Sequence, residues 1–307
     1  MLEIDLSYLN QCYARRRSWY PDIQTPRHQA RRVSGLAAIL DQFDLVLLDA
    51  YGVLCYHGSP VEGALEAVAL LRARNKRFCV VSNDTLANSE QAAHKYAGCG
   101  FDLTKDEVIT SLDITLSWLN SLPNKDSWGV MAPEAHFDHP QLEGMVHLNT
   151  CGETLAPEVD SLLFFSAAGW SPQQQDRLVT AAQHRQFSLA VGNPDVAAPA
   201  RKDGRDWLYA TPGYFLDDMV TRTDQRQSPL LLGKPGGCIF ETASRRYGDV
   251  PAERVLMVGD TLYTDILGGA AMGFSTLLLE SGVYRGVSVE SAISEAGIVP
   301  DFIAPHL

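Results

Sequence analysis

The stretch 44–54 (DLVLLDAYGVL) constrains the fold of this chain more than any other. Its apolar run 45–48 is short enough for a strand buried on both faces, and Asp49 follows it directly. Ligands of open α/β sheets bind beyond the carboxyl ends of the parallel strands, so we expect Asp49 to face a site. Gly52 then allows the chain to turn away sharply. A strand with a simple Asp-containing turn is the alternative interpretation of this stretch alone.

Three further apolar segments of strand length are followed by polar residues. Segment 78–81 leads into Ser82-Asn83, segment 230–232 into Gly233-Lys234-Pro235, and segment 254–258 into Gly259-Asp260. Helical spacing predicts helices at 64–75, 89–98 and 238–247. Short apolar runs predict strands at 108–110 and at 275–279, the last strand in the chain. A short helix is expected at 35–43, with Ser34 as its N-cap.

A second block of alternating strands and helices separates the two halves of this pattern. Apolar runs at 128–131, 161–165 and 187–191 and helical patterns at 113–120 and 173–185 have the composition of a separate α/β unit. Because strand–helix–strand units are parallel and right-handed in nearly all proteins, we predict an α/β fold. Its Rossmann-like, doubly wound parallel-sheet core comprises 35–110 and 228–307, and an inserted α/β cap domain comprises 111–227.

Two further segments are interpreted less specifically. Residues 1–34 carry arginine clusters and two prolines, and we expect a partly helical N-terminal extension that packs on the core or on a neighbouring subunit. Its arginines either bind an anion or form a solvated face. The turn Gly192-Asn193-Pro194-Asp195 ends a predicted strand of the cap, where it is either functional or simply favourable turn chemistry.

Charge and composition exclude several functions. The net charge of −12 and the pI of about 5.1 argue against a nucleic-acid partner, although a small phosphorylated substrate is compatible with a locally positive cleft. The six cysteines form no C-x-x-C pair, which indicates reduced, mostly buried thiols and a cytoplasmic protein. No apolar run reaches 18 residues, so neither export nor a membrane partner is expected.

Three carboxylates at the predicted strand ends indicate a metal site. Asp49, Asp260 and Asp265 would repel one another in one cleft unless a cation offset their charge, and their hard oxygens suit Mg²⁺. A carboxylate beside such an ion can attack phosphorus and form an aspartyl-phosphate, which divides hydrolysis into two easier steps.

The remaining strand-end residues fit the same chemistry. Ser82 and Asn83 would donate hydrogen bonds to the phosphoryl oxygens, and Lys234 would offset charge on the nucleophile and on the transferred group. Each residue has an ordinary structural explanation on its own. Their common position after a strand favours a catalytic site.

These motifs resemble those of the haloacid dehalogenase-like (HAD) hydrolases. The matching segments are 49–54, Ser82-Asn83, Lys234, and Gly259-Asp260 with Thr264-Asp265. The insertion between the second and third motifs resembles class IIA, the sugar-phosphatase-like and p-nitrophenyl phosphatase-like enzymes. The resemblance implies a phosphatase that acts on a small phosphorylated metabolite and a possible homodimer.

The same resemblance assigns the metal ligands. It implies that Mg²⁺ is held by Asp49, the backbone carbonyl of Tyr51 and Asp260, with Asp265 supporting the site. Phosphatases of the family carry an acid at the position of Tyr51, which protonates the leaving group and then activates water. General acid–base catalysis contributes roughly 10²–10⁴ in rate, so we expect Tyr51 or a carboxyl group of the cap, for which Asp195 is the candidate, to take this role.

Tyr51 leaves two alternatives open. The sequence Asp-Ala-Tyr-Gly also resembles the first motif of L-2-haloacid dehalogenases, which indicates metal-independent dehalogenation or phosphonate hydrolysis. The other alternative is a catalytically weak module that binds phosphorylated metabolites.

Overall fold

The computed structural model describes residues 2–23, 29–56, 58–150, 154–202, 205–248 and 250–307. The chain divides into two compact units. The core unit comprises Tyr20–Ser82, Ala87–Thr110 and Lys234–Leu307, and the inserted unit comprises Ser111–Gly233, Asn83–Leu86 and the chain up to Trp19. Within the described ranges, no helix is both long and apolar enough to cross a bilayer.

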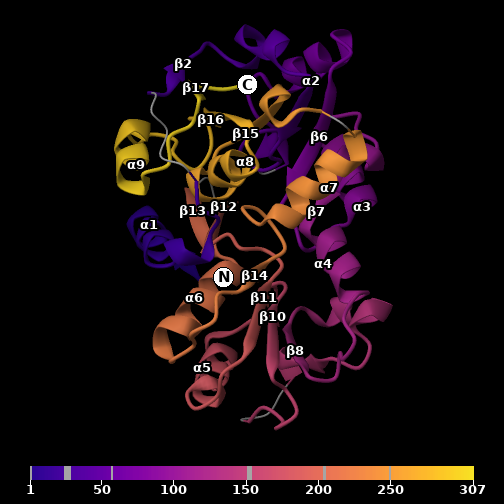
Figure 1. Cartoon of the computed structure of the whole chain (residues 1–307), viewed down its shortest axis with the longest axis vertical. Helices are drawn as coiled ribbons and strands as arrows, with labels where there is room; N and C mark the ends of the chain where they lie inside the picture. The colour runs from indigo at the N-terminus through magenta and orange to yellow at the C-terminus, as the bar shows by residue number, and fades with distance from the viewer. Residues whose placement is uncertain (1, 24–28, 57, 151–153, 203–204, 249) are drawn as a thin grey trace. The chain divides into compact units, whose positions relative to one another are not determined.

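A seven-stranded, all-parallel sheet forms the core unit (Figure 1). Its strands, in spatial order, are β2 (Arg31–Arg32), β17 (Phe302–Ala304), β16 (Ser275–Leu279), β15 (Val255–Gly259), β3 (Leu45–Leu48), β6 (Arg77–Ser82) and β7 (Val108–Thr110). All four residues of β3 are buried, as expected for a central strand covered on both faces.

The strand order reverses between β3 and β15. The chain first adds β6 and β7 on one side of β3, and after the insertion it adds β15, β16 and β17 on the other. The strand ends on either side of this topological switch point carry Asp49 and Asp260. Doubly wound sheets bind their ligands at this point, and the predicted fold class is confirmed.

Helices connect the strands of the core unit. They are α2 (Ala64–Ala73), α3 (Ser89–Ala97), α7 (Gly237–Tyr247), α8 (Leu267–Ala271) and α9 (Val289–Ala296), and a short hairpin of β4 (Cys55–Tyr56) and β5 (Ser59–Pro60) follows β3. Asn88 and Gln91 form a reciprocal capping box that defines the start of α3. Buried apolar side chains of α2 and α3, including Leu71 and Tyr96, pack with β3 in one continuous core.

The inserted unit contains a second parallel sheet of five strands. In spatial order they are β14 (Leu230–Leu231), β11 (Ser188–Val191), β10 (Ser161–Phe164), β8 (Trp128–Met131) and β9 (Val146–His147), and the helices are α4 (Ser111–Leu119), α5 (Pro172–Ala182) and α6 (Pro212–Arg222). Ser171 and Gln174 form the capping box of α5, with proline at its first position. The predicted inserted α/β domain is therefore present.

The chain up to Trp19 belongs to the inserted unit. It contributes α1 (Leu6–Arg15) and the strand β1 (Glu3–Ile4), which extends the antiparallel pair β12 (Ala197–Lys202) and β13 (Arg205–Ala210) into a three-stranded sheet. The sequence predicts an extension that packs on the core or on a neighbouring subunit, whereas the structure assigns it to the inserted unit. Its partners are distant in sequence, which a pattern of local residues does not reveal.

Three other expectations were wrong. Segment 230–232, expected to lead back into the core sheet, contributes β14 to the edge of the inserted sheet instead, where Ala190 pairs with Leu230. Segment 35–43 forms two 3-10 turns, Leu36–Ala38 and Leu40–Gln42, without a capping side chain. Strand β16 is not the last, because α9 and the three-residue β17 follow it. Short strands depend on their partners, so local apolar patterns miss them or assign them to the wrong sheet.

Candidate active site

Lys234 lies between two carboxylates of the core unit. Its Nζ is 2.6 Å from Oδ1 of Asp49, which follows β3, and 2.7 Å from Oδ1 of Asp265. The Lys234 side chain is 2% exposed and that of Asp265 is fully buried, whereas Asp49 keeps 13% of its side-chain surface exposed. Asp49 is therefore the member of this group that remains accessible to a ligand.

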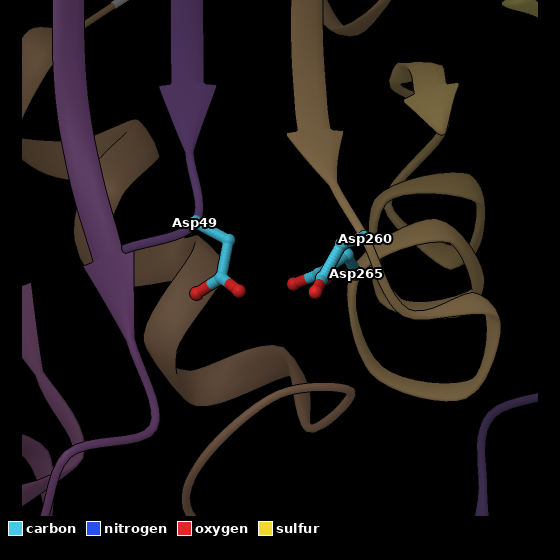
Figure 2. A group of neighbouring side chains, drawn as sticks. All are labelled: Asp49, Asp260 and Asp265. Atoms are coloured by element: carbon cyan, nitrogen blue, oxygen red, sulfur yellow. The ribbon is translucent and has the colours of Figure 1, made fainter. Parts of the chain in front are cut away.

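Asp260 completes the cluster from the end of β15. Figure 2 shows its carboxylate and that of Asp265 directed toward the carboxylate of Asp49, and one oxygen of each acid lies within 4.8 Å of the others. Thr261 Oγ1 donates to Asp260 Oδ1 at 3.0 Å, and the backbone N–H of Val283 donates to Oδ2 at 3.0 Å. These bonds hold the carboxylate in a fixed orientation.

Two glycines permit this close packing around Asp260. A Cβ atom at Gly52 would lie 2.1 Å from Asp260 Oδ2, and one at Gly282 would lie 1.8 Å from the same atom. Gly52 also has φ +87°, in the left-handed region that favours glycine. Any larger residue at either position would displace the buried carboxylate of Asp260.

Asp265 is positioned by a five-residue π-helix, Leu262–Ile266. Its Oδ1 accepts from Lys234 and its Oδ2 accepts from the backbone N–H of Thr261 at 3.1 Å. Single-turn π-helical segments occur often at functional sites. Because Asp265 is fully buried and accepts from Lys234, it is placed to orient that ammonium group.

The charges of the cluster do not balance. With all three carboxylates ionised, the single ammonium group of Lys234 leaves an excess of two negative charges among these largely buried groups. Burial, followed by repulsion from Asp49 and Asp265, raises the pKa of Asp260 well above its ordinary value. Hard oxygen ligands with this charge fit a divalent cation such as Mg²⁺, which would offset the excess.

Tyr51 lies two residues beyond Asp49 and is half-buried. Its ring packs at 5.6 Å, centroid to centroid, against that of Tyr56 in β4. The tight turn is closed by backbone bonds from Leu54 and Cys55 to the carbonyl of Ala50. Nearby Cys55 is buried, which raises the pKa of its thiol to about 12 and makes it inert core filling.

The predicted phosphate ligands lie where β6 ends. Ser82 is the buried last residue of β6 in the core unit, and Asn83 is buried in the inserted unit. Asn83 Oδ1 accepts from Ser111 Oγ at 3.2 Å, and its Nδ2 donates to Asp195 Oδ2 at 3.1 Å. Two residues that the sequence suggested separately, Asn83 and Asp195, are thus hydrogen-bonded to each other.

The turn that carries Asp195 is tightly enclosed. Asn193 Oδ1 accepts from the N–H of Asp195 at 2.9 Å, and Thr211 Oγ1 donates to the Asp195 carbonyl. A Cβ at Gly213 would lie 2.3 Å from the carbonyl of Pro194. The supporting residues Ser111 and Thr211 were not predicted, although each stands directly before or at the start of a helix, where such side chains are common.

A buried acid cluster at the switch point of a doubly wound parallel sheet defines an α/β protein that acts on a ligand bound beyond its strand ends. Two family models match the chain: haloacid dehalogenase-like hydrolase over residues 46–139, and HAD-hydrolase-like over residues 231–307. Together they span more than half of it. The chain belongs to the haloacid dehalogenase-like hydrolases, as its motifs predicted.

The similarity to known proteins extends over most of the chain. It is 26% identical over 299 residues to phosphoglycolate phosphatase 1A, chloroplastic, of Arabidopsis thaliana, covering 91% of this chain and 79% of that protein. It is 29% identical over 295 residues to human glycerol-3-phosphate phosphatase, covering 86% and 89%. A structure described as a possible sugar phosphatase from Cytophaga hutchinsonii shares the fold, with a TM-score of 0.74, 24% identity, and coverage of 90% and 98%.

Proposed function

We propose that this hydrolase is a Mg²⁺-dependent phosphatase of small phosphorylated metabolites that works through an aspartyl-phosphate. The observation that carries the proposal is the excess negative charge of Asp49, Asp260 and Asp265 around Lys234. The relatives named as phosphatases of phosphoglycolate and glycerol 3-phosphate support a phosphate monoester as substrate. We further propose a cytoplasmic protein; a homodimer remains a prediction from the family resemblance.

Each residue of the cluster has a role in this proposal. An oxygen of Asp49 bonds to phosphorus while the bond from phosphorus to the leaving oxygen breaks, and the leaving oxygen takes a proton from the acid–base group. Water then gives a proton to that group, cleaves the acyl phosphate and restores the carboxylate. Lys234 stabilises the charge of both states from its position beside Asp49, and Asp265 orients Lys234. Bound Mg²⁺ would be held by Asp49, Asp260 and the carbonyl of Tyr51 and would neutralise charge on the phosphoryl group.

Ser82 and Asn83 are proposed to bind phosphoryl oxygens, and Asp195 to bind the substrate. The Asn83–Asp195 bond makes these last two assignments interdependent, because a ligand that takes the Asn83 amide also changes the environment of Asp195. A second role, in which Asp195 supplies the missing acid, stays a prediction. It requires Asp195→Asn to lower kcat, whereas a binding role alone requires a higher KM.

Metal dependence tests the proposed function directly. Phosphate release from a panel of small phosphate esters is expected to cease after treatment with EDTA and to return when Mg²⁺ is added, because the excess charge of the cluster is then offset again. Halide release from 2-haloacids that is insensitive to EDTA would favour the dehalogenase alternative instead. Tight binding of phosphate esters without turnover would favour the binding module.

A substitution that places the family's acid at position 51 tests how Tyr51 affects the rate. Tyr51→Asp is expected to raise kcat by roughly 10², the lower end of what general acid–base catalysis contributes, because a carboxyl group replaces a phenol with an ordinary pKa of about 10. Tyr56→Asp, which also disrupts the Tyr51–Tyr56 ring contact, is the matched control and should give no gain. A Tyr51→Asp enzyme with unchanged or lower kcat would show that the acid–base group lies elsewhere.

A further inference from the structure

The N-terminal segment, residues 2–19, is built into the inserted unit at its hairpin. Glu3 and Ile4 pair in antiparallel register with Tyr209 and Leu208 of β13, and the N–H of Ala210 donates to the carbonyl of Leu2 at 2.9 Å. Strand β12, which pairs with the other edge of β13, begins at Ala197. Strand β1 therefore supports the hairpin of β12 and β13, which starts two residues after Asp195.

Helix α1 is anchored to α6 by a buried acid. The carboxylate of Asp217, with a side chain only 2% exposed, accepts from Arg15 and from Arg16 Nε, the latter at 2.7 Å. Arg16 also donates from Nη2 to Thr221 Oγ1 at 2.6 Å. Two guanidinium groups on one buried carboxylate form charge-assisted bonds that hold α1 in a single place against α6. These contacts account for Arg15 and Arg16 without an external anion.

From this anchored helix, Tyr13 reaches the turn that carries Asp195. Tyr13 is 1% exposed, and its hydroxyl oxygen accepts from the backbone N–H of Val196 at 3.2 Å. The carbonyl of Val196 accepts from the N–H of Thr211 at 3.2 Å, at the start of α6. Val196 is thus held on one side by α1 and on the other by α6. A buried N–H requires an acceptor, and here a residue almost two hundred positions away supplies it.

We propose that Tyr13 is a positioning residue for turn 193–196 and that the N-terminal segment thereby helps to determine substrate binding through Asp195. The segment lies outside both matched family regions, which cover residues 46–139 and 231–307. The effect on substrate rests on the proposed function, in which Asp195 binds the substrate. The positioning of the turn by Tyr13 does not depend on the proposed function.

Tyr13→Phe removes the hydroxyl and keeps the ring. With the Val196 N–H unpartnered, we expect the KM of the best phosphate-ester substrate to rise about five-fold, the equivalent of one ordinary hydrogen bond, with kcat within two-fold. The Lys234 cluster keeps its geometry through its own bonds to Thr261 and Val283. Tyr247→Phe is the matched control, because its hydroxyl donates to the carbonyl of Phe78 in the core unit at 2.7 Å; its KM should match that of the parent protein.

Amide hydrogen exchange of the full-length protein separates the two parts of the proposal. Peptides that contain Val196 are expected to exchange faster in Tyr13→Phe and at the parental rate in Tyr247→Phe. Unchanged exchange at Val196 would overturn the positioning role, whether or not any phosphate ester is hydrolysed. Faster exchange with an unchanged KM would overturn the link to substrate binding. Absence of phosphatase activity in the parent protein would refute the proposed function and leave the exchange result to decide the role of Tyr13.

Discussion

Asp49→Asn is expected to lower the rate of phosphate release by about 10⁴-fold or more, because an amide does not replace the carboxylate as a nucleophile. The substitution keeps the size of the side chain and a carbonyl oxygen that can accept from Lys234. It also removes one of three repelling negative charges. The melting temperature should therefore fall little, and the loss of rate is then a loss of chemistry. Initial rates of phosphate release and a thermal melt measure the two effects.

Asp44→Asn is the matched control for Asp49→Asn. Asp44 lies five residues earlier, directly before β3, and its carboxylate pairs with Arg254 at 2.6 and 2.9 Å. Asp44→Asn makes the same chemical change in the same unit, but Asp44 has no contact with Lys234 among the interactions described. The rate of phosphate release by Asp44→Asn should therefore stay within two-fold of the parental rate. Retention of a tenth of the parental rate by Asp49→Asn would place the nucleophile at another residue. A phosphoryl group trapped on Asp49 would identify it directly.

Lys234→Met should lower kcat by about 10³-fold, because the charge that stabilises the nucleophile and the transferred group is lost. It should also lower the free energy of unfolding by about 3–5 kcal/mol, the usual effect of breaking a buried ion pair. Lys234 is 2% exposed and bonds two carboxylates, so its removal leaves three acids to repel one another. Urea unfolding without divalent cations and steady-state kinetics with Mg²⁺ measure the two effects.

The matched control is Lys76→Met. Lys76 also belongs to the core unit, and its Nζ donates to the carbonyl of Phe43, but it contacts no acid of the cluster among the interactions described. Both the activity and the stability of Lys76→Met should be close to those of the parent protein.

Added Mg²⁺ is expected to recover part of the stability of Lys234→Met, because it offsets charge, without recovering the rate. Equal stability of Lys234→Met and the parent protein would contradict the charge imbalance that underlies the proposed metal site.

Most of the core and its acid cluster could be predicted from local sequence. Parallel strands place their carboxyl ends at one edge of a sheet, so Asp49 and Asp260, each directly after an apolar run, are expected there before any contact is known. Lys234 fitted the same logic for a weaker reason, because the apolar run before it contributes β14 to the other sheet. Its position beside Asp49 is correct, but the strand before it does not explain that position.

The surroundings of Asp195 could not be predicted. The sequence marked Asn83 as a strand end and Asp195 as a turn, yet their hydrogen bond joins residues over a hundred positions apart. Tyr13 and Asp217 carried no signal at all. A buried tyrosine on an amphipathic helix and an acid within another helix are common in any protein, and they acquire significance only from what they contact.

The order of apolar runs and polar ends along the chain was sufficient to determine the doubly wound sheet, the insertion and the acids at the switch point, because these follow from local periodicity and from the handedness of strand–helix–strand units. The tertiary structure alone decided which sheet each short strand joins, that the N-terminal segment belongs to the inserted unit, and which groups hold Asp195. Those features depend on hydrogen bonds and ion pairs between distant residues, and local sequence patterns do not encode such pairings.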